Sequence, residues 1–199
     1  MNPSAHGGGA ARGLALVGGG ARSGKSRFAL ELARGRAGRR AFVATAEAFD
    51  EEMRLRIDRH VADRGGDFFT IEAPRDLEAT IAALRGAADV VVVDCLTLWL
   101  SNLLVLGLEA SRIEARVVDL AGVLAQSPFA SIVVTNEVGM GIVPEAVLAR
   151  LFRDVAGRAH ELLARSAREI YFATTGVVVR LRPGPVEIAY PRDRDAGGV

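Results

Sequence analysis

The sequence is short of cysteine, of net charge and of long apolar runs. Cys95 is the only cysteine, which excludes an internal disulfide and is typical of a reducing compartment. The 25 basic and 24 acidic residues nearly cancel, so no overall field attracts nucleic acid or an anionic membrane. The longest apolar stretch, residues 90–108, contains Asp94, Ser101 and Asn102, which a membrane-spanning helix would not accommodate cheaply. A soluble protein without a membrane segment is expected.

Lysine is as scarce as cysteine, because Lys25 is the only lysine among the 25 basic residues. The others are all arginine. A position that keeps the compact ammonium in such a chain points to a site that a planar guanidinium would not serve.

The length of 199 residues, with 50% hydrophobic composition, suits one domain with one core. Residues 1–13 contain a glycine run without a basic segment followed by an apolar one, so we expect a flexible tail and a cytoplasmic location. Residues 183–199 begin with Pro-Gly-Pro and continue polar, and are expected to form a second tail. The domain then spans residues 14–182.

Short β-rich runs alternate with segments of helical period, which predicts an α/β fold. Strands are expected at residues 14–17, 40–45, 68–72, 90–94, 131–135, 170–173 and 177–181. Helices are expected at 24–36, 50–64, 75–85, twice within 96–126, and at 144–166 with Pro144 in its first turn. The strands at 90–93 and 132–134 are continuously apolar, as in a parallel sheet covered on both faces. We therefore expect a P-loop NTPase-type three-layer sandwich with a mostly parallel central sheet.

One segment between the first strand and the first helix matches G-x-x-x-x-G-K-[ST] in full, with the structural context that a P-loop requires. Its backbone N–H groups and the helix N-terminus would bind phosphates, Lys25 would reach the β and γ phosphates, and Ser26 would hold Mg²⁺. The alternative is a glycine-rich turn without a ligand. The predicted nucleotide-binding residues here are Gly19, Gly20, Ala21, Arg22, Ser23, Gly24, Lys25 and Ser26.

Asp94 ends the apolar strand at 90–93, where P-loop proteins place a carboxylate that reaches Mg²⁺ directly or through water. A carboxylate at this position could instead cap the helix that follows. The sequence leaves both roles open.

His60 lies off the apolar stripe of the helix expected at 50–64, between Arg56 and Arg64 on one helical face. Such a face could hold a triphosphate while a neutral imidazole attacks phosphorus. The alternative is a solvated helix face that includes a histidine. Of the remaining histidines, His6 lies in the expected tail and His160 is interpreted as solvated.

Residues 135–144, TNEVGMGIVP, follow a central strand and carry Asn136 and Glu137 at the edge where ligands bind in such sheets. They form either an active-site loop or an ordinary strand-to-helix connection.

Four segments in this order, GGARSGKS (19–26), DEEMRLRIDRH (50–60), TNEVGMGIVP (135–144) and FRDVAGR (152–158), resemble the bifunctional adenosylcobinamide kinase and adenosylcobinamide-phosphate guanylyltransferase of cobalamin synthesis. The resemblance covers about residues 14–181. Some members of this family carry two adjacent histidines where this chain has Arg59 and His60, and glutamate where it has Asp94; the second change keeps the carboxylate but shortens its reach.

The resemblance implies two reactions. A nucleoside triphosphate, ATP or GTP, phosphorylates adenosylcobinamide; His60 then attacks the α phosphorus of GTP and passes GMP to adenosylcobinamide phosphate. It also implies a homotrimer, whereas the balanced charge predicts no nucleic-acid partner. The further GTP contacts that the resemblance implies are Thr45, Ala46, Glu47, Val61, Ala62, Asp63, Arg64, Glu72 and Asp94. The alternative is a simple P-loop kinase of a small metabolite, with His60 inert.

Overall fold

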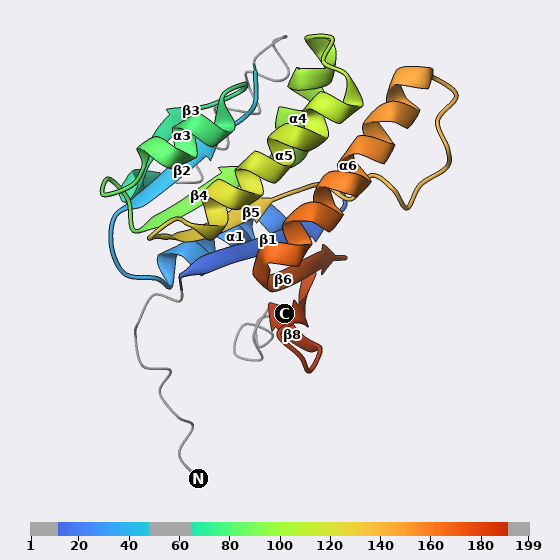
Figure 1. Cartoon of the computed structure of the whole chain (residues 1–199). Coiled ribbons are helices and arrows are strands. Elements are labelled where there is room, and N and C mark those ends of the chain that lie inside the picture. The colour runs from blue at the N-terminus through green and yellow to red at the C-terminus, as the bar shows by residue number, and fades with distance from the viewer. Residues whose placement is uncertain (1–11, 48–64, 191–199) are drawn as a thin grey trace.

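The computed structural model describes residues 12–47 and 65–190, and within them the chain forms one eight-stranded sheet (Figure 1). The strand order is β3-β2-β4-β5-β1-β6-β7-β8. Strands β1 to β6 are parallel, and β7 and β8 extend the sheet antiparallel at one edge. The strands are β1 Gly13–Gly19, β2 Arg40–Ala44, β3 Phe68–Glu72, β4 Val90–Asp94, β5 Ala130–Val134, β6 Ala167–Thr174, β7 Val177–Arg182 and β8 Glu187–Tyr190.

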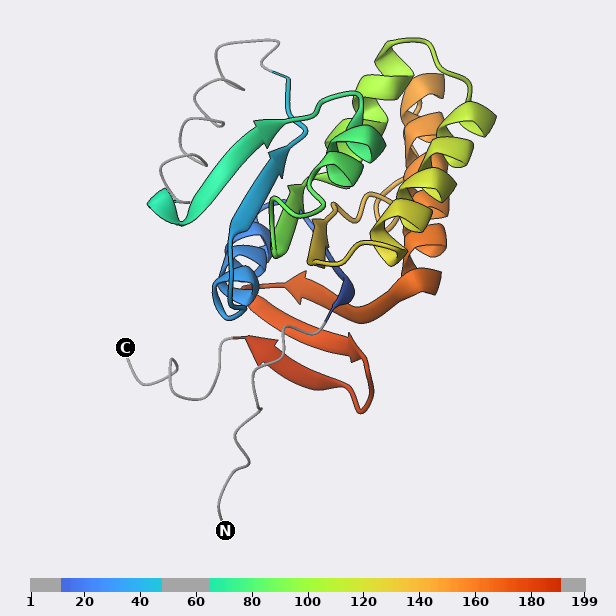
Figure 2. The ribbon, with the colours of Figure 1, turned by 60° about the vertical axis from the view of Figure 1, so that its left-hand side comes forward.

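Helices cover both faces of the sheet, as Figure 2 shows, with α1 on one side and α3 to α6 on the other. A short 3-10 helix, η1, precedes β3. The bounds are α1 Lys25–Arg34, η1 Gly65–Asp67, α3 Leu77–Ala83, α4 Leu96–Val105, α5 Ala110–Ala125 and α6 Val147–Ser166.

Alternation within the apolar strands builds a core on each face. Successive side chains of a strand point to opposite faces, so Val91 and Val93 of β4 pack with α3 to α6, whereas Val90 and Val92 pack on the side of α1. All four valines are fully buried. A strand that needs apolar residues at every position is central, and β4 and β5 lie inside the sheet as their sequences predict.

The expected α/β class, with a mostly parallel sheet between helical layers, is confirmed. Each of the seven predicted strands is present, and the stretch at 96–126 contains two helices. The helix expected at 50–64 lies outside the described residues.

Two expectations are corrected. Residues 187–190 form β8, which pairs with β7 through Val179 and Ile188, although the sequence analysis assigns them to a tail. Pro144 does not begin a helix, because α6 starts at Val147. Arg150 stabilises the non-helical segment that leads into α6, because its Nη1 donates to the carbonyls of Pro144 and Glu145, at 3.0 and 2.5 Å.

Candidate active site

The P-loop joins β1 to α1 at the carboxyl edge of the sheet, and its glycines have steric reasons to be there. Gly19 has a φ of 151°, and a Cβ at this position would come within 2.4 Å of the Ala173 carbonyl on β6. Gly24 has a φ of 90° at the N-cap of α1. Backbone of this kind excludes ordinary side chains, so the loop can approach a ligand closely.

Lys25 and Ser26 open α1, as the motif predicts. The Lys25 side chain is buried, and its Nζ donates to the Gly20 carbonyl at 3.0 Å across the loop. Ser26 is half-buried. The first N–H groups of α1 have no acceptor within the helix, so this end attracts an anion. Gly19, Lys25 and Ser26 thus lie in a loop between a strand and a helix N-terminus, which is the local structure that the motif predicts.

Asp94 is the last residue of β4 and is half-buried. It does not cap the next helix, since the N-cap of α4 is Cys95 and makes no side-chain capping bond. The capping alternative therefore fails. Burial, reinforced by the Asp94 carboxylate, raises the pKa of the neighbouring Cys95 thiol to about 11, so this thiol is protonated at neutral pH and is no nucleophile.

Thr45, expected among the GTP contacts, is fully buried and links the ends of β2 and β4. Its hydroxyl accepts from the Cys95 N–H at 2.8 Å and donates to the Cys95 carbonyl at 2.7 Å. The Thr45 carbonyl accepts from Asn102 Nδ2, which also bonds the Pro74 carbonyl. The Thr45 side chain is therefore engaged in holding this edge of the sheet together.

A cavity of about 380 Å³ lies beyond β2 and β3, and its lining includes Glu47 and Glu72. Two residues that are 25 positions apart, both expected to contact GTP, thus lie together at the carboxyl edge. Arg75, which the sequence analysis did not single out, closes one side by pairing its Nε with Glu47 Oε1 at 2.9 Å. Ala46 lies next to Glu47 and is half-buried.

The segment after β5 lies between the P-loop and Asp94, because β5 separates β1 from β4 in the sheet (Figure 1). Asn136 Nδ2 donates to Thr97 Oγ1 at 2.9 Å on the β4 side. The Glu137 N–H donates to the Gly19 carbonyl at 2.9 Å on the P-loop side. These two hydrogen bonds favour the interpretation of residues 135–144 as an active-site loop over an ordinary strand-to-helix connection.

His160 was interpreted as solvated, and this is wrong. Its Nε2 lies 2.6 Å from Thr135 Oγ1, and its Nδ1 lies 3.9 Å from Glu137 Oε2. Only 17% of the side chain is exposed. Burial lowers the pKa of His160, and the Glu137 carboxylate opposes that change. The signal was available in the helical spacing, because Ala156, Ala159 and Leu163 form the buried face of α6 beside it.

Comparison with known proteins connects this site to an established family. The family model described as cobinamide kinase / cobinamide phosphate guanyltransferase matches residues 15–181. The chain belongs to this family. The match includes the P-loop, Asp94, the segment after β5 and all of α6.

The chain matches curated relatives of the cobinamide kinase / guanyltransferase family over nearly the whole length of each relative. The bifunctional adenosylcobalamin biosynthesis protein CobP of Pseudomonas aeruginosa is 39% identical over 171 residues, which are 86% of this chain and 98% of the relative. The CobU proteins of Escherichia coli and Salmonella typhimurium are 37% and 38% identical over 181 residues, covering 85% of this chain and 99% of each relative. These homologues are named bifunctional enzymes of cobalamin biosynthesis, and the chain is a member of an enzyme family.

Among solved structures, an ATPase from a type III secretion system of pathogenic bacteria superimposes with a TM-score of 0.56 at 10% identity, covering 82% of this chain and 51% of the ATPase. This likeness shows the fold alone, and it agrees with the expected P-loop NTPase-type architecture.

His60 and the expected GTP contacts Val61, Ala62, Asp63 and Arg64 lie outside the described residues. Within the described residues, no group of three or more histidine, cysteine or acidic side chains could hold a metal ion, and no helix there is long and apolar enough to cross a membrane.

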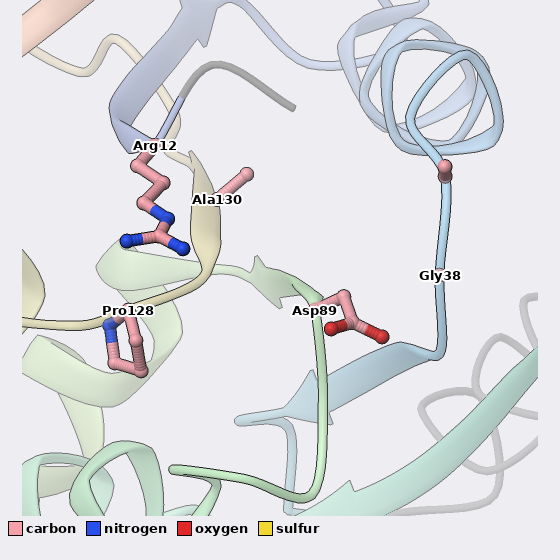
Figure 3. A pocket seen from close by; sticks show the side chains of 6 residues that line it. Arg12, Gly38, Asp89, Pro128 and Ala130 are labelled. Atoms are coloured by element: carbon pink, nitrogen blue, oxygen red, sulfur yellow. The ribbon is translucent and has the colours of Figure 1, made fainter. Parts of the chain in front are cut away.

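A second cavity, of about 290 Å³, lies at the opposite edge of the sheet, where β1, β4 and β5 begin (Figure 3). Arg12 and Asp89 are among its lining residues, and Asp89 accepts from the Arg39 N–H at 2.8 Å. The P-loop is at the other end of β1. This cavity therefore lies apart from the P-loop.

Proposed function

We propose that the chain phosphorylates the aminopropanol hydroxyl of adenosylcobinamide with ATP or GTP, and then transfers GMP from GTP to adenosylcobinamide phosphate. The products of the second reaction are adenosylcobinamide-GDP and pyrophosphate. The observation that carries this proposal is the complete P-loop, with Gly19, Lys25 and Ser26 in position, in a chain that matches the family model over most of its length.

For the kinase reaction, the backbone of residues 19–26 binds the β and γ phosphates and Lys25 offsets their charge. Ser26 and Asp94 would hold Mg²⁺. Both are half-buried oxygen ligands at the same edge of the sheet, and a hard cation that keeps several waters needs few protein ligands. When bound there, Mg²⁺ would neutralise charge on the phosphates.

For the guanylyltransferase reaction, the His60 imidazole attacks the α phosphorus of GTP and pyrophosphate leaves. The resulting phosphoramidate passes GMP to adenosylcobinamide phosphate. The cavity beyond β2 and β3 supports a nucleoside site there, because it is lined by Glu47 and Glu72 at the carboxyl ends of the strands, the end of the sheet where the P-loop also lies. A carboxylate can accept from the paired N–H donors of guanine.

The experiment that tests this function separates it from the simple kinase. The purified chain is incubated with adenosylcobinamide, Mg²⁺ and GTP. The corrinoid products are then separated and identified by their masses in mass spectrometry. The proposal predicts adenosylcobinamide phosphate first and adenosylcobinamide-GDP later. A product that stops at the phosphate, even when adenosylcobinamide phosphate is supplied, supports the simple kinase instead.

We further propose that the protein is a homotrimer in the cytoplasm, where both nucleotides are available. Support for subunit contacts comes from exposed apolar side chains on the loop before α6 and on its first turn, which we call the apolar loop patch. Contiguous exposed apolar surface marks a contact site. The patch consists of Met140, Ile142, Val143, Val147 and Leu148.

A further inference from the structure

The phosphoryl transfer proposed above must release a proton from the attacking hydroxyl, and the segment after β5 holds a carboxylate beside the P-loop. Glu137 is tied to the first P-loop glycine by the bond from its N–H to the Gly19 carbonyl. The preceding residue, Asn136, is tied to Thr97 at the start of α4. The backbone at Glu137 is therefore held on both sides, between the P-loop and the end of β4.

The Glu137 side chain is also held in place. Its Oε1 accepts from the Gly139 N–H at 2.6 Å. A Cβ at position 139 would come within 2.9 Å of the same oxygen, so glycine leaves room for this closed turn. Arg153 of α6 fixes the turn from outside by donating to the Gly139 carbonyl at 2.8 Å. One carboxylate oxygen is thereby engaged in the turn, and the other, Oε2, lies on the side of His160.

That other oxygen, Oε2, faces His160 of α6. His160 Nε2 bonds the buried Thr135 hydroxyl at 2.6 Å, and Nδ1 lies 3.9 Å from Oε2. A neutral imidazole has one donor and one acceptor nitrogen. If Thr135 donates to Nε2, the hydrogen is on Nδ1 and points toward the carboxylate, which is the favourable arrangement. The tautomer is assigned from this pattern.

The other carboxylates at the carboxyl ends of the strands are paired, lie far from the P-loop strand β1, or already have a proposed role. Glu47 pairs with Arg75, Glu72 lies at the far edge of the sheet on β3, and Asp94 is assigned to Mg²⁺. Glu137 alone among these four has a bond to the P-loop backbone. It is also a quarter exposed, so a substrate can reach it.

We propose that Glu137 accepts the proton of the substrate hydroxyl in the phosphoryl transfer, and that His160 is the positioning residue that orients it. The hydroxyl oxygen forms a bond to the γ phosphorus, and the bond from that phosphorus to the β–γ bridging oxygen breaks. The proton passes to Glu137 Oε2, and the nucleoside diphosphate leaves. This inference rests on the proposed function.

The two reactions make the inference testable, because only one of them deprotonates a hydroxyl. An imidazole attacks the α phosphorus with a lone pair, and a phosphate dianion needs no base to accept GMP. In Glu137→Gln we expect kcat of the kinase reaction to fall on the order of 100-fold, while GMP labelling of the protein and GMP transfer to supplied adenosylcobinamide phosphate stay within about twofold of wild type.

The matched control is Glu145→Gln, the same change at an exposed position in the same connection, which should leave both reactions unchanged. The inference is overturned if Glu137→Gln retains kinase activity within about threefold of wild type. It is equally overturned if both reactions fall together, since Glu137 would then support the P-loop as a whole. A wild-type protein without either reaction contradicts the proposed function itself.

The role of His160 has its own test. In His160→Ala the kinase kcat should fall about tenfold with KM for the nucleotide unchanged, and GMP labelling should persist. His160→Asn, whose amide can place a donor near the position of Nδ1, should recover part of that loss. Equal loss in both variants, or a loss shared with GMP labelling, would show that His160 only supports the fold.

Discussion

Lys25 is the single residue on which the nucleotide site depends most. It is buried, its Nζ reaches the Gly20 carbonyl, and every other basic residue in the chain is arginine. A guanidinium is larger and planar, so it cannot replace an ammonium inside a closed loop without moving the loop.

In Lys25→Arg we therefore expect both the kinase and the guanylyltransferase rates to fall on the order of 100-fold, measured with saturating GTP. The matched control is Arg112→Lys, an exchange between the same residue types at an exposed position of α5, which should change neither rate. Full activity in Lys25→Arg would show that the charge alone matters at this position.

His160 gives a second prediction, in the pH dependence of stability. Burial lowers its pKa below the usual value of about 6.5. The folded chain then binds fewer protons than the unfolded chain, so this histidine lowers stability as the pH falls through about 6.5 and has no effect well above it. Between about pH 8 and 5.5, urea unfolding should show a smaller loss of stability for His160→Asn than for wild type. Identical pH dependence would mean that His160 is hydrated in solution.

At the scale of elements, the pattern of apolar residues predicted the inner strands β4 and β5 correctly but missed the edge strand β8. The runs at residues 90–93 of β4 and 132–134 of β5 are apolar at every position, and this pattern has few alternatives in a chain of this length. Strand β8 was missed because the Pro-Gly-Pro stretch at residue 183 suggested a tail. The alternation of Val186, Ile188 and Tyr190 after it is a hairpin signal, and it was available in the sequence.

The links between elements could not have been read from the sequence. Thr45 and Cys95 are 50 residues apart, and their bond depends on β2 and β4 being neighbours. The same holds for Thr135 and His160, whose contact requires α6 to pack across the end of β5. Local patterns specify which residues form a strand or helix, whereas these contacts follow from the order of strands in the sheet.

The Thr45 bond yields a prediction for the junction of β2 and β4. In Thr45→Val the buried Cys95 N–H loses its partner, whereas the Cys95 carbonyl keeps the bond from the Trp99 N–H, so the free energy of unfolding should fall by about 1–3 kcal/mol. Thr70→Val on the exposed surface of β3 is the control and should change stability by less than about 0.5 kcal/mol. Chemical denaturation followed by circular dichroism measures both. An equal effect of the two substitutions would contradict the structural role of Thr45.

At the scale of the whole molecule, the parallel sheet gathers residues from four distant segments at one edge. The P-loop, Glu47 and Glu137 come after β1, β2 and β5, and Asp94 is the last residue of β4. This arrangement follows from the rule that parallel strands present their carboxyl ends together, so the sequence could predict the edge. It could not predict which side chains are already bonded, as Thr45 and Glu47 are.

The proposed trimer is tested by mass in solution. Sedimentation equilibrium should give three times the 21.1 kDa of one chain. Ile142, at 97% exposure, is the most exposed member of the apolar loop patch, and Ile142→Asp should shift the protein toward monomer. Val118→Asp, an equivalent change on α5, should remain trimeric. A wild-type monomer would contradict the proposed assembly, and a trimeric Ile142→Asp would remove the patch from the contact.

The central claim is that one P-loop serves two chemistries through a covalent GMP–histidine intermediate at His60. The most direct measurement is to incubate the protein with GTP labelled at the α phosphorus, denature it and count the label that remains. A phosphoramidate is released by acid and survives alkali. We predict retained label with this behaviour in wild type and in His160→Asn, and none in His60→Ala. Absence of label in wild type, or equal label in His60→Ala, would contradict the account.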